Sequence, residues 1–384
     1  MSGSHWSRVL GSAIRGVESR FDELRGREQR RPRQVVAYRG FGTRAAIHVS
    51  GRVLANPPVG VSRAEDPWWR NLVATYRRMG SAEVPGAVVE VEVNGGRTQA
   101  VTDDEGYFRA HVEPATALRQ DRLWHDGRVR VLSDPSVSAP LYVLTPPAGA
   151  QFGVLSDLDD TVVRTDVANT VRMLREILIG NARTRLPFAG VAAFYRALHR
   201  GANGERLNPI FYVSSSPWNL YDLLLDFLEH RDIPVGPLFL RDWGVSEQEI
   251  LPRGHGLHKH GAIRQILDCY TDMPFILIGD SGQEDPEIYR DVVREYPKRI
   301  LAVYIRNVTP RPLRVEAIQR LAQEVKEAGS TLVLSDDTLS AARHAAEHGW
   351  IDAQELEEVA AEGRAETRPR DPTAPTVVVE EDGA

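Results

Sequence analysis

The second half of the chain alternates short apolar runs with longer amphipathic segments, and this alternation restricts the fold more than any other feature. The apolar runs predicted to be strands lie at residues 152–156, 209–215, 237–240, 274–280, 299–305 and 331–334. Segments with helical spacing lie at 167–180, 189–200, 218–230, 257–271, 285–295, 313–328 and 338–347. Such alternation predicts an α/β domain built on a doubly wound, mostly parallel sheet. We place this domain at residues 150–362.

The preceding residues, 35–148, follow a period of two instead. Apolar and polar residues alternate in short runs that Gly, Pro, Asn and Asp turns separate, as in 87–95 and 97–113. This pattern is typical of antiparallel strands, so we predict an all-β sandwich domain. No catalytic constellation occurs in it, which favours a recognition or scaffold role.

Both ends of the chain differ from these two domains. The spacing of apolar residues in 1–34 predicts an amphipathic helix, and this segment contains many arginines. Such a helix can lie on an anionic membrane as a peripheral anchor, or its apolar stripe can pack on a neighbouring domain while the arginines stay solvated. Residues 363–384 contain too little apolar surface to order themselves, so we expect a disordered tail.

Composition restricts the environment and the partners. The net charge of −6 gives no general attraction to nucleic acid, and no nucleic-acid partner is expected. The single cysteine, Cys269, excludes a disulfide framework and fits a reducing cytoplasm. No segment approaches the roughly 20 apolar residues that span a bilayer. We therefore expect a cytoplasmic protein that is peripheral to membranes at most.

Chemically active side chains follow the predicted strands. They are Asp157, Asp159 and Thr161 after the first strand, Ser214 and Ser215 after the second, Asp280 and Asp285 after the fourth, and Lys259 in the turn that opens helix 257–271. The carboxyl ends of parallel strands share one edge of a sheet, where ligands bind. Crowded aspartates need neutralisation, and Mg²⁺ with a lysine supplies it. The set predicts phosphoryl transfer through a covalent aspartyl phosphate.

Each residue type has a role in that chemistry. Asp157 would attack phosphorus, Asp159 would protonate the leaving oxygen and then activate water, and Lys259 would neutralise the phosphoryl group. Ser214 would bind phosphoryl oxygens, with Thr161 as a further catalytic member and Ser215 on the substrate side. The predicted Mg²⁺ ligands are Asp157, Asp159 through its backbone carbonyl, Asp280 and Asp285.

Two further groups of residues leave alternatives open. Arg241 and Arg306 end strands on the catalytic edge, where they would bind a second anionic group of the substrate or form surface salt bridges. His255, His258 and His260 invite a metal site, but no cysteine or further histidine lies near them in the sequence. We therefore predict no metal there.

The order of these motifs resembles the haloacid dehalogenase superfamily of phosphohydrolases. The resemblance rests on four features: D-x-D-x-T at 157–161, a strand ending in Ser214, the lone Lys259, and G-D-x-x-x-x-D at 279–285. The longer strings LSDLDDTVVRTDV, FYVSSSPWNLYDLL, HKHGAIRQIL and LIGDSGQEDPEIY resemble the narrower actin-patch-associated phosphatidate phosphatase family. That resemblance implies a Rossmann-like catalytic domain over most of 150–310. It also implies hydrolysis of phosphatidate to diacylglycerol and phosphate.

The spacing of the motifs bears on substrate size. Between Thr161 and Ser214 lie 52 residues, and between Ser215 and Lys259 lie 43, too few for a separate cap domain of sheet type. An open site suits a large substrate, unless the sandwich domain or another subunit provides a lid. The rival interpretations are a phosphatase for another large phosphomonoester, such as a phosphoprotein or nucleic-acid end, and a catalytically inactive lipid- or protein-binding module.

Overall fold

The computed structural model describes residues 33–55, 82–158, 190–241, 254–308 and 311–367. The described residues divide into two compact units. The first takes in the residues up to Leu118 together with His125–Val143, and the second takes in Arg119–Trp124 and the residues from Leu144 onward. The predicted N-terminal helix and residues 56–81 lie outside the described residues.

The first unit is an antiparallel sheet. Its strands are β1 (Gln34–Ala37), β2 (Gly40–Gly42), β3 (Ile47–Ala55), β4 (Ala82–Glu83), β5 (Val88–Val93), β6 (Gly96–Val101), β7 (Tyr107–Val112), β8 (Trp124–Val131) and β9 (Asp134–Leu144). Their order is β1-β3-β2-β9-β8-β5-β6, with β4 and β7 also paired to β3. An all-β unit is therefore confirmed.

The sheet of this unit encloses a single apolar core. Ile47 and Val49 of β3, Phe108 of β7, and Val89 and Val91 of β5 belong to one buried cluster. Because these strands lie at different positions of the sheet order, the sheet must curl to bring their inward faces together. Alternation of buried and more exposed residues along strands such as β5 and β7 directs one face of each strand into this core.

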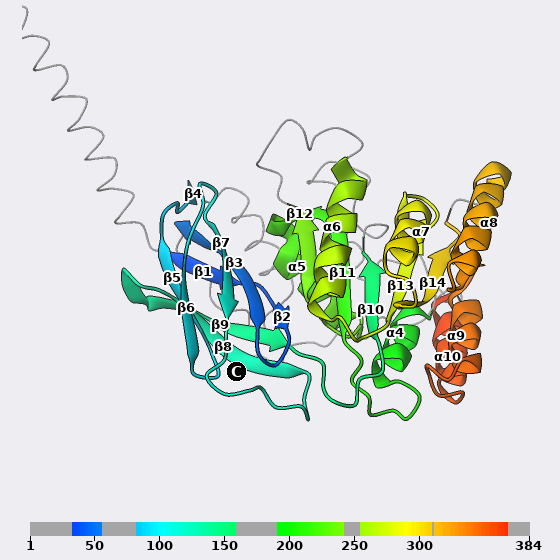
Figure 1. Ribbon diagram of the computed structural model, residues 1–384, viewed down its shortest axis with the longest axis horizontal. Helices are drawn as coiled ribbons and strands as arrows, with labels where there is room; N and C mark the ends of the chain where they lie inside the picture. Colours follow the sequence, from blue (N-terminus) through cyan, green and yellow to red (C-terminus); the bar gives the residue numbers. More distant parts are fainter. Residues whose placement is uncertain (1–32, 56–81, 159–189, 242–253, 309–310, 368–384) are drawn as a thin grey trace, which may run out of the picture. The chain divides into compact units, whose positions relative to one another are not determined.

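The second unit contains a six-stranded parallel sheet that positions the candidate site (Figure 1). Its strands are β10 (Gly153–Asp157), β11 (Ile210–Pro217), β12 (Leu238–Arg241), β13 (Phe275–Asp280), β14 (Ile300–Arg306) and β15 (Leu332–Ser335). Their order is β12-β11-β10-β13-β14-β15, and all the neighbours pair in parallel. Counted from β10, the order is 3-2-1-4-5-6. The chain therefore reverses direction across the sheet between β10 and β13, and ligands bind in open parallel sheets at such a reversal.

Helices cover both faces of this sheet. They are α4 (Val191–Arg200), the 3-10 turn η2 (Trp218–Leu220), α5 (Tyr221–His230), α6 (Gly254–Cys269), α7 (Asp285–Glu295), α8 (Pro312–Glu327), α9 (Thr338–Glu347) and α10 (Glu355–Thr367). Phe211 and Tyr212 of β11 are consecutive and so point to opposite faces. Phe211 contacts Tyr270, which follows α6, with ring centroids 5.5 Å apart. Tyr212 stacks on Tyr195 of α4 with ring centroids 6.4 Å apart. The helices α4, α9 and α10 pack together, whereas α7 contacts both α6 and α8.

The elements that the sequence predicted from residue 189 onward agree with this fold to within about three residues at each end. The predicted helix 167–180 lies outside the described residues. The C-terminal helix α10 is an addition, and it ends at Thr367, beyond the expected start of the tail at residue 363. Among the described residues, no helix is both long enough and apolar enough to cross a membrane.

Candidate active site

Lys259 lies at the centre of an acidic cluster on the carboxyl edge of the sheet. Its Nζ lies 2.9 Å from Asp157 Oδ1 and 3.0 Å from Asp285 Oδ1. It also donates a hydrogen bond to Gln283 Oε1 at 3.2 Å. The side chains of Asp157, Lys259 and Asp285 are only 3%, 3% and 0% exposed. Buried carboxylates are tolerated here because the buried ammonium neutralises them in part.

Asp280 and Asp285 occupy the two ends of a tight loop between β13 and α7. The Asp280 carboxylate accepts hydrogen bonds from the N–H of Gly282 at 2.6 Å and of Gln283 at 3.3 Å. Asp285 Oδ2 accepts from the N–H of Asp280 at 3.2 Å. The loop is thus organised around carboxylates that accept hydrogen bonds from its own backbone.

Gly279 allows Asp285 to approach the strand. A Cβ at this position would lie 2.5 Å from Asp285 Oδ2 and 2.8 Å from both Asp285 Cβ and Tyr289 Cε2. Only a glycine fits such a close approach of side chains to backbone. The glycine before Asp280 at the end of β13 therefore has a steric role, because it leaves space for the Asp285 side chain.

The cluster fits a hard divalent cation. Asp157, Asp280 and Asp285 each offer a carboxylate oxygen, and these oxygens lie within 4.8 Å of one another. Three carboxylates and the Lys259 ammonium sum to a formal charge of −2, which a divalent cation balances. Carboxylate oxygens are the ligands that Mg²⁺ prefers. Among the described residues, this is the only group of three or more such side chains that could hold a metal.

Arg314 of α8 contacts the same loop from outside, and no sequence motif indicated this contact. It donates to Ser281 O at 3.0 Å and to Gln283 O at 2.6 Å. It also forms a two-pronged ion pair with Glu287, whose carboxylate raises the pKa of the guanidinium. The bonded carbonyls flank Gly282, which donates to the Asp280 carboxylate, so Arg314 restrains the backbone that surrounds this carboxylate.

Tyr195 of α4 reaches the site from the opposite face, also without a sequence signal. Its hydroxyl lies 2.6 Å from Ser156 Oγ. Ser156 Oγ donates to the carbonyl oxygen of Asp157 at 2.9 Å, so Tyr195 must be the donor in the first bond. Burial raises the pKa of Tyr195, and the nearby Arg306 charge opposes that rise. Residue 157 is therefore held by its carboxylate on one face and by its carbonyl on the other.

Tyr289 of α7 lines the other side of the cluster. Its hydroxyl donates to Ile278 O at 2.9 Å. Burial raises its pKa well above the ordinary value, and the charges of Asp285, Asp157 and Asp280 add to the rise. Tyr289 therefore stays protonated beside three carboxylates.

The predicted phosphate-binding serines lie at the carboxyl end of β11. Val213 pairs with Asp157, so Ser214 lies one residue beyond the level of Asp157 at the sheet edge. Ser214 and Ser215 are 0% and 4% exposed. Ser214 Oγ accepts a hydrogen bond from the N–H of Ser216 at 3.0 Å. The register between β11 and β12 shifts between Val213 and Pro217, and this irregularity bends the strand end beside the cluster.

Arg241 and Arg306 flank the cluster at the same edge of the sheet. Arg241 ends β12, and Arg306 ends β14 in register with Asp280. Each strand is two places away from β10, which corresponds to roughly 10 Å across the sheet. Both arginines are half-buried. Their roles as substrate contacts remain predictions.

Other predicted positions fall outside this geometry. Asp159 and Thr161 lie outside the described residues, as does the segment around Asp160. His260 lies 3.3 Å from Glu295, an acid that Arg264 also pairs with at 2.8 Å. The side chain of His255 is outside the described part of the chain. Among described residues, no three ligands gather around these histidines.

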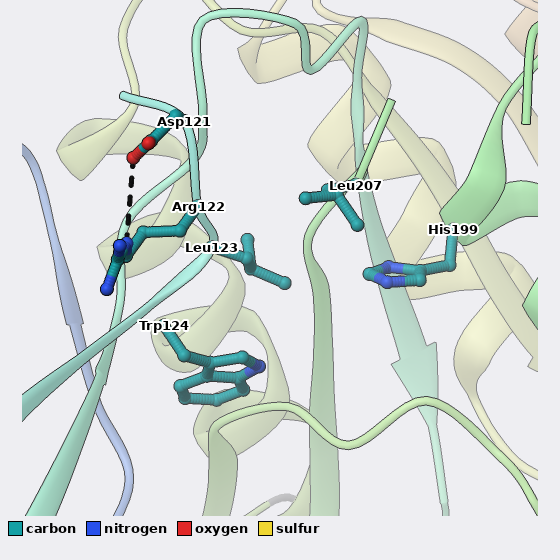
Figure 2. A pocket seen from close by; sticks show the side chains of 6 residues that line it. All are labelled: Asp121, Arg122, Leu123, Trp124, His199 and Leu207. Carbon is teal, nitrogen blue, oxygen red and sulfur yellow. Dashed lines mark ion pairs between the residues drawn. The ribbon is translucent and has the colours of Figure 1, made fainter. Parts of the chain in front are cut away.

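A separate hollow of about 440 Å³ lies elsewhere in the second unit (Figure 2). Its lining residues are Asp121, Arg122, Leu123, Trp124, His199 and Leu207. His199 ends α4 and Leu207 precedes β11, so the hollow lies toward the amino ends of the strands, opposite the acidic cluster. Figure 2 shows the Arg122–Asp121 ion pair, at 3.5 Å, at the rim. None of the predicted site residues lines it.

Together, the fold and the cluster define an α/β protein with a lysine-bridged carboxylate site at the reversal point of a parallel sheet. Residues 152–307 match the family model described as phosphatidate phosphatase APP1, catalytic domain. This segment is therefore similar to the catalytic domain of the APP1 phosphatidate phosphatase family, the resemblance that the sequence motifs predicted. All the site residues named above except Arg314 lie within it.

Two fungal proteins share this similarity. Phosphatidate phosphatase APP1 of Saccharomyces cerevisiae is 34% identical over 156 residues, which are 40% of this chain and 26% of the yeast protein. An uncharacterized protein of Schizosaccharomyces pombe is 30% identical over 160 residues, 41% of this chain and 25% of that protein. The similarity thus spans about a quarter of each relative's length.

Similarity to solved structures is low. The PilB minor pilin of Streptococcus sanguinis aligns with 76% of this chain and 96% of its own length. The TM-score is 0.25 and the identity is 8%, values too low to bear on fold or function.

Proposed function

We propose that this protein is a Mg²⁺-dependent phosphatidate phosphatase that forms diacylglycerol and phosphate through an aspartyl-phosphate intermediate. The observation that carries the chemistry is the contact of Lys259 with both Asp157 and Asp285 beside Asp280. The substrate rests on the family match of residues 152–307 and on the name of the yeast relative. The strand order 3-2-1-4-5-6 supports a Rossmann-like sheet of the haloacid dehalogenase type.

Asp157 would act as the nucleophile. Its carboxylate oxygen would form a bond to phosphorus while the ester P–O bond breaks, and Asp159 would give its proton to the departing glycerolipid oxygen. Water would then attack the acyl phosphate, losing its proton to Asp159, and the P–O bond to Asp157 would break to release phosphate. The role of Asp159 is argued from the sequence, because it lies outside the described residues.

The remaining residues would stabilise charge and hold position. Lys259 would stay on Asp157 and share its positive charge with the phosphoryl oxygens. Asp157 and Asp280 would hold Mg²⁺, which when bound supplies neutralisation of the phosphate charge. Asp285 bonds to Lys259 and to the N–H of Asp280, so it would orient both and support the metal directly or through water.

Phosphate release from a panel of monoesters tests the proposal. Phosphatidate in mixed micelles is expected to give a higher kcat/KM than glycerol 3-phosphate, because the soluble ester shares the chemistry but lacks interfacial contacts. EDTA should stop turnover and excess Mg²⁺ should restore it, whereas Ca²⁺ should support little because its coordination shell is larger and looser.

The possible outcomes separate the parts of the proposal. Full activity in chelator-treated protein would remove the metal from it. Equal rates on phosphatidate and soluble esters would remove the lipid substrate and leave the phosphatase. A preference for phosphoproteins or nucleic-acid ends would replace the lipid with that substrate. No release from any ester by Mg²⁺-loaded protein would favour a binding module.

A further inference from the structure

The first turn of α8 presents an unusual surface near the acidic cluster. Arg311, Pro312 and Leu313, which we call the α8 tip, are all exposed. Leu313 is 80% exposed, more than the other exposed large apolar residues among those described, which are Val88 at 36%, Tyr142 at 44% and Val101 at 62%. A single exposed leucine is ordinary on a protein surface. The surroundings of Leu313 are what distinguish it.

The position of the tip is fixed by the residue next to it. Arg314 lies four, seven and eleven residues before Ile318, Leu321 and Val325, the buried residues of α8, and so shares their face of the helix. Its guanidinium bonds to Ser281 O and Gln283 O in the loop after Asp280. Leu313 is one step round the helix from that face and points away from it. The start of α8 is therefore joined to the loop between β13 and α7, while Leu313 faces outward.

The charge of the tip favours an anionic surface. The first turn of α8 contains no acidic side chain. Arg311 precedes it, is exposed, and forms no ion pair with the described residues around it. An apolar side chain beside an exposed arginine that pairs with no acid among the described residues matches the interface of an anionic bilayer, where the leucine enters the acyl boundary and the arginine meets phosphates.

We propose that the α8 tip docks the protein on an anionic phospholipid bilayer and that Arg314 thereby sets the bilayer against the acidic cluster. This inference rests on the proposed function, because a lipid phosphomonoester is the substrate that such docking would serve. The surface lies outside the segment 152–307 that matches the family model. It adds to the catalytic residues and replaces none of them.

A fluorophore at the tip tests the docking directly. Cys269 is the chain's one cysteine, and burial raises its thiol pKa to about 11, so a maleimide at neutral pH will select a thiol introduced by Leu313→Cys. The full chain carries an environment-sensitive label there, and Val101→Cys, on β6 of the first unit, is the matched control. Vesicles of phosphatidylcholine with phosphatidylserine, which is anionic but no phosphomonoester, should shift the Leu313→Cys emission to the blue and leave the control unchanged.

Unlabelled variants give the strength of the contact. Leu313→Ser should weaken co-sedimentation with these vesicles roughly fivefold or more. Arg311→Ser should weaken it about threefold to fivefold at low salt and less at high salt. Val101→Ser should have no effect. Hydrolysis of a soluble aryl phosphate should be unchanged by Leu313→Ser, while release from phosphatidate in vesicles should fall.

The outcomes distinguish docking from catalysis. Unchanged vesicle binding by Leu313→Ser, or equal emission shifts at both labelled positions, overturns the docking proposal even if phosphatidate is hydrolysed. An emission shift that depends on protein concentration without vesicles assigns the tip to a second copy and also overturns it. Vesicle binding through the tip without phosphatidate hydrolysis supports docking and contradicts the substrate instead.

Discussion

Lys259 Nζ lies between Asp157 Oδ1 and Asp285 Oδ1, at 2.9 and 3.0 Å. One buried ammonium thus connects the expected nucleophile at the end of β10 to the acid that begins α7. Three carboxylates surround a single cation, so the cluster without metal retains excess negative charge. Removing a carboxylate and removing the lysine should therefore have opposite effects on stability.

Asp157→Asn should abolish turnover without loss of the fold. Asparagine keeps the volume but removes the nucleophile and one negative charge, so the melting temperature in EDTA should equal or exceed that of the wild type. Phosphate release and thermal melting on the same preparation check both parts. A variant that keeps more than a few per cent of the wild-type rate would contradict the covalent mechanism.

Lys259→Met should instead destabilise the protein. It leaves Asp157 and Asp285 buried without their cation, a change that costs about 3 kcal/mol or more. Urea unfolding in EDTA measures the loss of free energy, and the double variant Lys259→Met with Asp157→Asn should recover part of it. Equal stability of the wild type and Lys259→Met would mean that the ion pairs do not form in solution.

Gly279→Ala should disturb the site by a steric route. The new Cβ meets Asp285 Oδ2 at 2.5 Å, so Asp285 must move away from Lys259 and from the N–H of Asp280. We expect at least about a tenfold loss of kcat/KM with a cost of about 1–3 kcal/mol. Gly261→Ala, in α6, is the matched control, because beyond the adjacent helix backbone its added Cβ meets no atom of the described residues within 4 Å, and it should be neutral or stabilising. Similar behaviour of the two variants would exclude the steric argument.

The sequence predicted the sheet and the central cluster because local patterns specify both. Apolar runs such as 274–280 have a clear period, and the carboxyl edge of a parallel sheet gathers whatever follows each strand. Asp157, Lys259, Asp280 and Asp285 were therefore predicted together and lie together. Asp159 and Thr161 share the same motif, and their positions remain predictions.

The features that the sequence missed depend on tertiary contacts. Among the described side chains of α10, only Val359 is deeply buried, while Glu358 and Glu362 form ion pairs with Arg196 of α4. The sequence of this helix therefore has no apolar stripe that would predict it. Strand β9 contains two prolines, which argue against a strand in a sequence reading. Arg314 and Tyr195 reach the site from α8 and α4, and a single sequence does not show which helix faces which loop.

Tyr195→Phe should lower activity through the position of Asp157. Phenylalanine keeps the stacking on Tyr212 but removes the donor to Ser156 Oγ, so the link to the Asp157 carbonyl loses its anchor. We expect kcat to fall about threefold to tenfold with little change in KM, because a misplaced nucleophile affects the reaction more than binding. Ser156→Ala should add nothing to this loss in the double variant. Fully additive losses would show that the two hydroxyls act independently.

The stability of the second unit should fall at mildly acidic pH through His344 of α9. Burial lowers the pKa of His344 below 6.5, the charge of nearby His348 lowers it further, and Glu347 opposes the shift. Its Nδ1 lies 3.0 Å from the Tyr304 hydroxyl. Burial raises the pKa of that hydroxyl, so it remains protonated and donates to the neutral imidazole. A lowered folded-state pKa means that the unfolded chain binds more protons, so stability is complete above pH 6.5 and is lost as the pH falls from there toward the folded-state value.

His48 and His199 also have lowered pKa values. The wild-type melting temperature should therefore fall between pH 7 and 5, and His344→Gln should remove only part of the decline. A wild-type melting temperature that does not change over this range, or an imidazole resonance of His344 that titrates at or above 6.5, would contradict the prediction.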